Sequence, residues 1–382
     1  ELTRPSRVVL DFAHPNVHLR QVTMGGRPVD AEWVHNHVVI DARDTVAGRN
    51  TVRCAFTSGD EALHRRGNLL YTLFVPAKAH TAFPCFDQPD LKARVSLTLD
   101  LPAGWEAVAN GAEADRRTGG NRVVVRFAET PPISTYLIAF AAGPLQRELV
   151  SAGGRAFRVF HREPDAALVA ANLPAIADLH TSALTWLEDY TGIPYPFVKF
   201  DMLLVPSFEF GGMEHPGAVF YQQASLLLPA SATDEERRSR AHLIAHETAH
   251  MWFGNLVTMR WFDDVWLKEV FANLMAEKIL AAGKPDEGAS LRFYLAHYPA
   301  AYDVDRTRGA HPIRQHLENL DRAGDLYGPI VYQKSPIAFR ELESRMGADQ
   351  LRAAVREYLE TFTWGSAAWP DLLARCEAAC GA

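Results

Sequence analysis

The sequence predicts an α+β fold, in which a strand-rich amino-terminal half precedes a mostly helical half. Up to about residue 154, apolar and polar residues alternate in short segments, as in strands with one buried face. After Gly153-Gly154 the apolar residues recur at helical spacing instead. The chain has 382 residues, 48% of them hydrophobic, which is more than one core usually holds. We therefore expect two domains, residues 1–154 and residues 155–382.

The first half is predicted to be an antiparallel β sandwich. Residues 95–101 alternate without a fault, as a strand with one solvent-facing side should. The expected strands are residues 7–12, 37–40, 51–56, 95–101, 122–127 and 136–140.

The second half contains two helices with clear boundaries. One begins before Ile176 and presents a single apolar side, which Gly192 is suited to end. Thr233 and Glu236 have the spacing of a capping box at the start of the other. A short strand is expected between them, at residues 202–205.

The capped helix carries His246-Glu247-Thr248-Ala249-His250. On a helix the two histidines lie at i and i+4, so both imidazoles project from one face toward a single ion. Glu269, 19 positions after His250, supplies a third ligand from a later segment. Two histidines and one carboxylate leave a fourth tetrahedral position open for water, which is typical of catalytic zinc. We predict one Zn²⁺ per chain, with Glu247 placed to act on the water.

His242 lies one turn before His246 and has the same helical spacing. Because three protein ligands suffice for a catalytic zinc, we interpret His242 as a packing or surface histidine.

A second motif, Gly211-Gly212-Met213-Glu214-His215, follows the strand expected at residues 202–205. Paired glycines let a backbone approach a ligand closely, and an exposed strand edge pairs with an extended peptide. Glu214 would then offer a carboxylate to that ligand. A glycine turn with a surface glutamate is the alternative that this segment alone leaves open.

The composition of the sequence excludes some classes of binding partner and indicates a cellular compartment. The formal net charge is -7 and the pI is near 6.1, which gives no basic field for nucleic acid or anionic lipid. The sequence contains no run of 18 apolar residues, the length that would predict a membrane span. Four scattered cysteines, Cys54, Cys85, Cys376 and Cys380, are too few for a disulfide framework and fit a reducing compartment. We expect a cytoplasmic protein; secretion stays open because the sequence does not begin with Met, and the oligomeric state is undetermined.

Together with Pro84-Cys85-Phe86-Asp87-Gln88-Pro89, the two motifs resemble the zinc aminopeptidase family of aminopeptidase N and leukotriene hydrolase. Their order and spacing agree with that family, and the resemblance covers nearly the whole chain. It implies an amino-terminal β domain followed by a thermolysin-like catalytic domain. The family's large helical carboxy-terminal domain is expected to be absent from this chain.

The resemblance implies hydrolysis of the amino-terminal peptide bond of peptides. Glu247 would be the general base, Glu214 would hold the free α-ammonium, and Tyr332 would hydrogen-bond the developing oxyanion. The implied zinc ligands are His246, His250 and Glu269, and the implied substrate-binding residues are Gly211, Gly212, Met213, Glu214 and His215.

Two departures from the family pattern keep other activities open. Leu73-Phe74-Val75-Pro76 stands where many members have Gln-Phe-Glu-Pro, which removes one carboxylate from the amine clamp, and His215 replaces the usual Asn. The histidine would alter a hydrogen bond or add pH sensitivity near neutrality. The alternatives are a related zinc hydrolase with endopeptidase or epoxide hydrolase activity, or a non-catalytic interaction scaffold.

Overall fold

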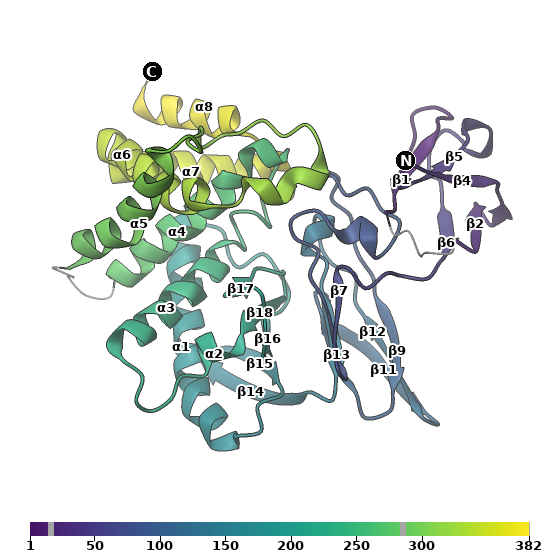
Figure 1. Cartoon of the computed structure of the whole chain (residues 1–382), viewed down its shortest axis with the longest axis horizontal. Helices are drawn as coiled ribbons and strands as arrows, with labels where there is room; N and C mark the ends of the chain where they lie inside the picture. Colours follow the sequence, from purple (N-terminus) through teal and green to yellow (C-terminus); the bar gives the residue numbers. More distant parts are fainter. Residues whose placement is uncertain (14–18, 283–287, 382) are drawn as a thin grey trace.

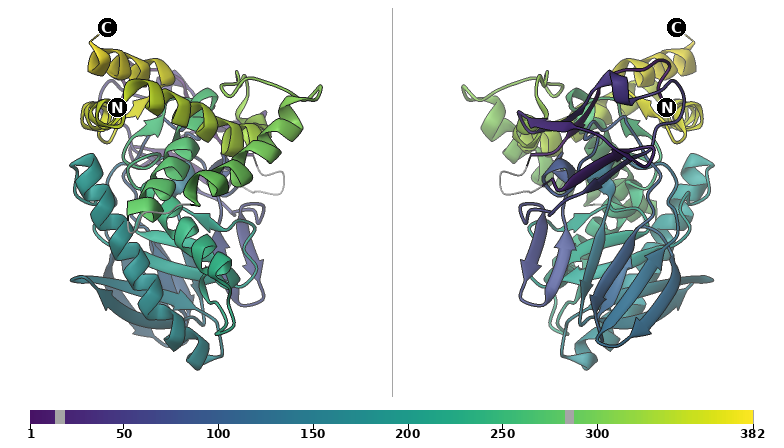
Figure 2. Two further views of the ribbon diagram at one scale, coloured as in Figure 1. Left: turned by 90° about the vertical axis from the view of Figure 1, so that its left-hand side faces the viewer. Right: turned by 90° about the vertical axis from the view of Figure 1, so that its right-hand side faces the viewer.

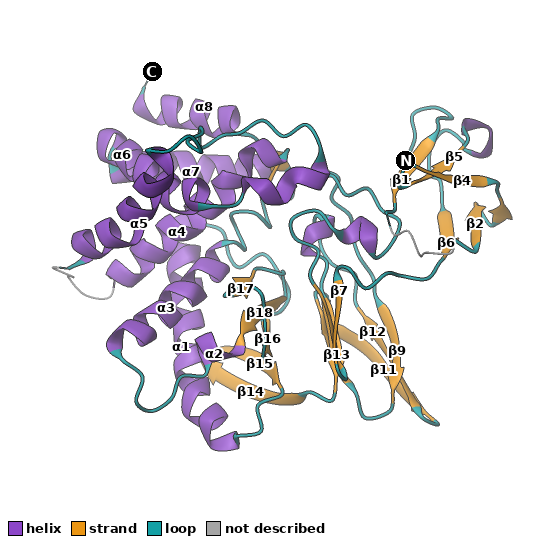
Figure 3. Ribbon diagram, in the orientation of Figure 1, coloured by secondary structure: helices purple, strands orange, loops and turns teal. Residues whose placement is uncertain are grey.

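The computed structural model describes residues 1–13, 19–282 and 288–381. Figure 1 shows a strand-rich amino-terminal part beside a part in which most of the helices lie, and Figure 3 colours the same view by secondary structure. The predicted α+β order of a strand-rich part followed by a helical part is therefore confirmed.

The strands before residue 144 form small sheets in which every pairing is antiparallel. The first sheet has the strand order β1 (Val8–Asp11), β5 (His37–Ile40), β4 (Ala31–Val34). The second has the order β3 (Arg27–Pro28), β2 (Gln21–Met24), β6 (Val52–Ala55). The third has the order β10 (Glu106–Ala109), β13 (Phe140–Gly143), β8 (Leu69–Thr72), β7 (Leu63–Arg66). The fourth has the order β11 (Glu113–Gly119), β12 (Arg122–Phe127), β9 (Thr98–Pro102).

The four sheets do not share one core but pack face to face as two pairs. Leu10, Val22 and Ile40 belong to a small core of the first two sheets alone. Tyr71 on β8 lies in the large core of the helical part, where its ring centroid is 6.4 Å from that of Phe220. The right-hand view of Figure 2 places these purple and blue strands in front of the helices. Val125 of β12 shares another small core with Ala107 of β10. The strand-rich part is thus built from two pairs of facing antiparallel sheets rather than one sandwich, and one sheet of the second pair also packs on the helical part.

Two expected strands differ from the observed elements. Residues 136–140 were predicted as a strand, but Thr135–Leu137 form a 3₁₀ turn and β13 begins only at Phe140. The run from Tyr136 to Ala139 is buried throughout, so it has no solvent-facing side of the kind that an alternating strand presents. In the segment 95–101, pairing with β12 begins only at Thr98. The strands expected near residues 7–12, 37–40, 51–56, 122–127 and 202–205 are present.

The helical part also contains a five-stranded mixed sheet, which the description as mostly helical missed. Its order is β14 (Gln146–Ala152), β15 (Arg155–His161), β16 (Asp201–Val205), β18 (Ala218–Gln222) and β17 (Gly212–Met213). Gly153 and Gly154 form the turn between β14 and β15, both with positive φ. Sheet membership therefore changes between Gly143 and Gln146, whereas the division at residue 154 remains a prediction.

The two helix boundaries that the sequence predicted, the end of α1 and the start of α3, are confirmed. For α1 (Ala166–Thr191), the Asp165 carboxylate accepts from the N–H groups of Ala167 and Leu168, and Gly192 ends the helix at φ 73°. For α3 (Asp234–Ala249), Thr233 and Glu236 form the expected capping box. The remaining helices are α2 (Gln223–Leu226), α4 (Val265–Ala282), α5 (Ala289–Asp305), α6 (Ser335–Met346), α7 (Ala348–Phe362) and α8 (Trp369–Cys380). A π-helical turn at Ile330–Lys334 precedes α6, and the short parallel pair β19 (Thr258–Met259) and β20 (Ser366–Ala367) lies near the carboxyl end.

Helix α4 is the centre of the helical part. Every residue from Val265 to Ala276 is buried, so this stretch has no solvent-facing side. It packs against α3 and α6. Polar side chains on such a helix must find partners inside the protein, because an unsatisfied buried polar group costs about 1 to 3 kcal/mol. Those of α4 meet at the site described below.

All four cysteines are free thiols. Among the residues that the structure describes, none of the helices has the length and apolarity that crossing a bilayer would require.

Candidate metal centre and substrate cleft

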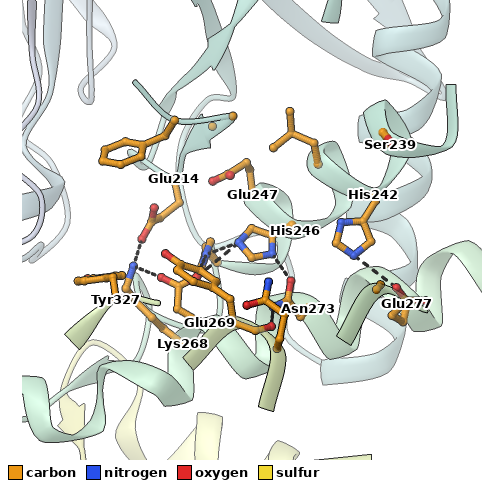
Figure 4. Close-up of a pocket in the computed structure, with 18 of the residues that line it drawn as sticks. Glu214, Ser239, His242, His246, Glu247, Lys268, Glu269, Asn273, Glu277 and Tyr327 are labelled. Atoms are coloured by element: carbon orange, nitrogen blue, oxygen red, sulfur yellow. Dashed lines mark hydrogen bonds and ion pairs between the residues drawn. The ribbon is translucent and has the colours of Figure 1, made fainter. Parts of the chain in front are cut away.

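His246, His250 and Glu269 converge at the contact between α3 and α4. Figure 4 shows His246 beside Glu269. The two histidine Nε2 atoms lie 3.1 Å apart, and Glu269 Oε2 lies 3.5 Å from the first and 3.6 Å from the second. Tetrahedral zinc with ligands at about 2.0–2.2 Å separates ligand atoms by about 3.3–3.5 Å. The three predicted ligand atoms therefore fit one such ion.

The other ring nitrogens of these histidines face oxygen acceptors. His246 Nδ1 lies 2.9 Å from Asn273 Oδ1, and His250 Nδ1 lies 3.0 Å from the main-chain oxygen of Phe253. When both Nδ1 atoms donate, both Nε2 atoms carry lone pairs that face each other. Two lone pairs at 3.1 Å repel unless a cation lies between them, so the donor set fits a metal ion.

Carboxylates give this site a preference for positive charge. Burial lowers the pKa of His250, but Glu214 and Glu269 outweigh burial and raise the pKa to about 9. One ligand atom each of Glu214, Glu247 and His250 lie within 4.8 Å of one another, so a second acidic group adjoins the triad.

Glu247 points into the cleft from the turn between the two histidines (Figure 4). Its side chain is buried, and its Oε2 atom has no hydrogen-bond partner among the described residues. Burial raises the pKa of Glu247 to about 8. A carboxylate with a free oxygen beside a cation site is equipped to accept a proton.

The glycine motif forms β17, the last strand of the five-stranded sheet. Among the strands that the structure describes, β17 pairs with β18 alone, so its other edge can pair with an extended peptide. A Cβ atom on Gly212 would lie 2.4 Å from Glu247 Oε1, and one on Gly211 would lie 3.2 Å from the Leu243 side chain. Close packing on α3 therefore explains both glycines.

Glu214 is buried at the end of this strand and pairs with Lys268. The Lys268 ammonium lies 2.7 Å from Glu214 Oε1 and 2.8 Å from Glu269 Oε1. Burial alone raises the pKa of Glu214, but Lys268 and His250 outweigh burial and hold the pKa below its usual range. The alternative interpretation of Glu214 as a surface glutamate is therefore wrong, because this residue is only 3% exposed.

His215 does not have the pH sensitivity near neutrality that was considered for it. The ring is fully buried, is not among the residues that line the cleft, and finds no hydrogen-bond partner among the described residues. Burial lowers its pKa to about 3, so the ring stays neutral at physiological pH. Its main-chain N–H donates to Met213 O at 2.9 Å.

Two tyrosines line the cleft. Tyr332, predicted from the sequence, lies in the π-helical turn, and Tyr327 lies 6.2 Å from it between ring centroids. The Tyr327 hydroxyl is buried without a hydrogen-bond partner among the described residues, and its ring lies 5.9 Å from the Lys268 ammonium. Burial raises the pKa of both tyrosines above the ordinary range, so both keep their protons.

The cleft has a volume of about 1100 Å³ and extends beyond the triad along α3. His242, interpreted from the sequence as a packing or surface residue, lines this extension and lies 3.5 Å from Glu277. His297 on α5 lines it as well. Val75 borders the cleft, whereas Leu73 is buried in the core and is not part of the lining.

The sequence-based reasoning missed Lys268, Asn273 and Tyr327. A signal existed for the first two, because they are polar residues in the otherwise apolar segment 265–276, beside Glu269 and one turn after it. Tyr327 carries no local signal, since only the fold brings residues 320–332 against the cleft.

Comparison with known proteins agrees with this architecture. Aminopeptidase N of Streptomyces lividans is 31% identical over 388 residues, which cover 97% of this chain and 44% of the relative. The puromycin-sensitive aminopeptidase of Caenorhabditis elegans is 34% identical over 310 residues, covering 80% of this chain and 32% of the relative. Leucyl aminopeptidase of Saccharolobus solfataricus is 30% identical over 319 residues, covering 82% of this chain and 39% of the relative. The chain thus spans less than half the length of these relatives.

Family models match both parts of the molecule. The peptidase M1 N-terminal domain matches residues 58–137, within the strand-rich part. The peptidase family M1 domain matches residues 176–382, more than half of the chain, and includes the triad, Glu247, Glu214 and both tyrosines. The chain belongs to the M1 family of peptidases.

Proposed function

We propose that this chain forms a zinc-dependent aminopeptidase site, which hydrolyses the first peptide bond of peptides with a free amino terminus. One observation carries the proposal: His246, His250 and Glu269 meet beside a free strand edge that ends at the buried carboxylate of Glu214. The names of the three relatives, all aminopeptidases, support it.

One zinc ion per chain fits the triad. When bound, zinc polarises the scissile carbonyl and makes a water nucleophilic at neutral pH. The chain contributes two ring lone pairs and one carboxylate aimed at one point from two packed helices.

Glu247 acts as the general base in this proposal. It takes a proton from the attacking water and returns the proton to the leaving amine. Positive charge at the triad favours its carboxylate form, against the burial that raises its pKa. Its unpartnered Oε2 atom leaves it free to accept.

Glu214 selects substrates with a free amine. A peptide that pairs with β17 and has its ammonium at Glu214 presents its first peptide bond to the triad, because Glu214 and His250 have ligand atoms within 4.8 Å. Lys268 divides its charge between Glu214 and Glu269, which leaves Glu214 able to hold a second cation. An internal peptide segment has no ammonium to offer there.

Tyr332 donates a hydrogen bond to the developing oxyanion, and such a donor is worth about 3 kcal/mol. Tyr327 is a second candidate for this role, since its hydroxyl is buried and has no hydrogen-bond partner among the described residues. We also propose the finer features that the resemblance implied: a thermolysin-like catalytic domain, a division near residue 154 and a cytoplasmic location.

A second function is favoured by one observation. Val75 stands where a clamp carboxylate was expected, and Lys268 already pairs with Glu214. Both weaken the grip on a substrate amine, which favours a related zinc hydrolase with endopeptidase or epoxide hydrolase activity. A non-catalytic scaffold has no need of the triad, and zinc analysis of the purified chain excludes or supports it.

The test compares one peptide with a free and with an acetylated amino terminus. The aminopeptidase proposal expects cleavage of the free peptide alone, and loss of that activity with a chelator. Glu247→Gln should retain the fold and zinc yet lose at least about a hundredfold in turnover. Equal cleavage of both peptides would favour the endopeptidase alternative.

A further inference from the structure

Asn273 is a buried asparagine on α4, one turn after Glu269 (Figure 4). Its Oδ1 atom lies 2.9 Å from His246 Nδ1, and its Nδ2 atom lies 3.2 Å from the main-chain oxygen of Tyr332. One amide group thus joins a residue of the triad to the backbone that carries Tyr332.

The orientation of this amide follows from its partners. The main-chain oxygen of Tyr332 can only accept, so the amide atom that faces it must be the donor Nδ2. Oδ1 then faces His246, and the ring nitrogen opposite it must carry the hydrogen. The network therefore fixes the neutral tautomer of His246 that has its lone pair on Nε2, toward the triad.

The sequence explains why the Tyr332 carbonyl is available for this contact. In an α-helix it would accept from the N–H group of residue 336, but residue 336 is a proline and has no N–H group. The backbone is in a π-helical turn there, from Ile330 to Lys334. Asn273 Nδ2 therefore donates to a carbonyl to which Pro336 cannot donate.

We propose that Asn273 is a positioning residue that sets the tautomer of one zinc ligand and anchors the backbone of the oxyanion tyrosine. This inference rests on the function proposed above. Asn273 is on a stretch of α4 that is buried on all sides, so its amide gives both groups a common rigid reference. Displacing a catalytic group by about 1 Å costs up to a hundredfold in rate, so the anchor matters for turnover.

Two substitutions separate the two halves of this role. Asn273→Asp keeps an oxygen acceptor for His246 but replaces the donor to Tyr332 with a second oxygen, which repels the carbonyl. Asn273→Leu, of similar size, removes both contacts. Asn172 on α1 is the matched control, a buried asparagine whose Nδ2 donates to Leu168 O and Leu228 O.

Zinc affinity is measured first, by competition with a chromogenic chelator and without substrate, and then kcat and KM at saturating zinc. For Asn273→Asp we expect zinc affinity within threefold of the wild type, kcat at least tenfold lower and KM within threefold. For Asn273→Leu we expect zinc affinity about 10- to 100-fold weaker. Asn172→Leu should lower the melting temperature and leave zinc affinity within twofold.

Wild-type kcat in Asn273→Asp, or wild-type zinc affinity in Asn273→Leu, would overturn the inference. Weak zinc binding by Asn273→Asp would overturn it too, because the acceptor for His246 is kept. A wild-type chain that binds no zinc would instead refute the proposed function, so the two failures are distinguishable.

Discussion

Gly212→Ala should disable the site without unfolding the protein. The new Cβ atom would lie 2.4 Å from Glu247 Oε1 and 2.5 Å from its Cδ, whereas ordinary contacts begin at 3.4 Å. The carboxylate must therefore move by about 1 Å, and a displacement of that size in a reacting group costs up to about a hundredfold in rate, or about 2.7 kcal/mol. The clashing atoms, which include Cγ at 2.6 Å, belong to the Glu247 side chain and not to the backbone, so the side chain can move while the fold is kept.

The assay is kcat on an aminoacyl reporter at saturating zinc, with the melting temperature measured in parallel. Gly211→Ala is the matched control, because its Cβ atom would meet the Leu243 side chain at 3.2 Å, which needs a shift of only a few tenths of an ångström. We expect at least a 30-fold loss for Gly212→Ala and less than a fivefold loss for Gly211→Ala. Equal losses, or a wild-type rate for Gly212→Ala, would refute the placement of the base against this strand.

Three further predictions concern two contacts at the site and one ion pair outside the cleft lining. Glu214→Gln should raise KM for free peptides at least tenfold, because it removes the charge that binds the amine; an unchanged KM contradicts this role. Tyr332→Phe should lower kcat about a hundredfold and Tyr327→Phe less than tenfold, and the reverse order would assign the oxyanion contact to Tyr327. His80 Nδ1 lies 2.6 Å from Asp87 Oδ2; burial lowers the pKa of His80, but Asp87 outweighs burial and raises it. The pair therefore contributes fully to the free energy of unfolding below a pH of about 6.5, and this contribution is lost as the pH rises through the folded-state pKa of His80. In Asp87→Asn, the free energy of unfolding measured across this pH range should not show the loss.

The chemistry of the metal centre was predictable because its signals are local. Helical spacing places His246 and His250 on one face, and the capping residues Thr233 and Glu236 define where that helix begins. Glu269 was predicted from its distance along the chain and from the resemblance, and the packing of α3 on α4 brings it within 3.6 Å of both histidines.

What the sequence did not reveal depends on contacts between distant segments. The five-stranded sheet joins strands that lie between residues 146 and 222 of the chain, and no local pattern specifies their order. The 3₁₀ turn at Thr135–Leu137 replaces a strand because burial on all sides removes the alternation on which strand prediction depends. Lys268 has a role only because the fold brings Glu214 to it across the cleft.

Zinc binding tests the central claim most directly. Elemental analysis and chelator competition should give one zinc per wild-type chain, and Glu269→Gln should weaken its affinity at least about a hundredfold, because the triad loses its only negatively charged ligand. A wild-type chain without zinc, or a Glu269→Gln variant that binds zinc as tightly as the wild type, would contradict the convergence of these three residues on one ion.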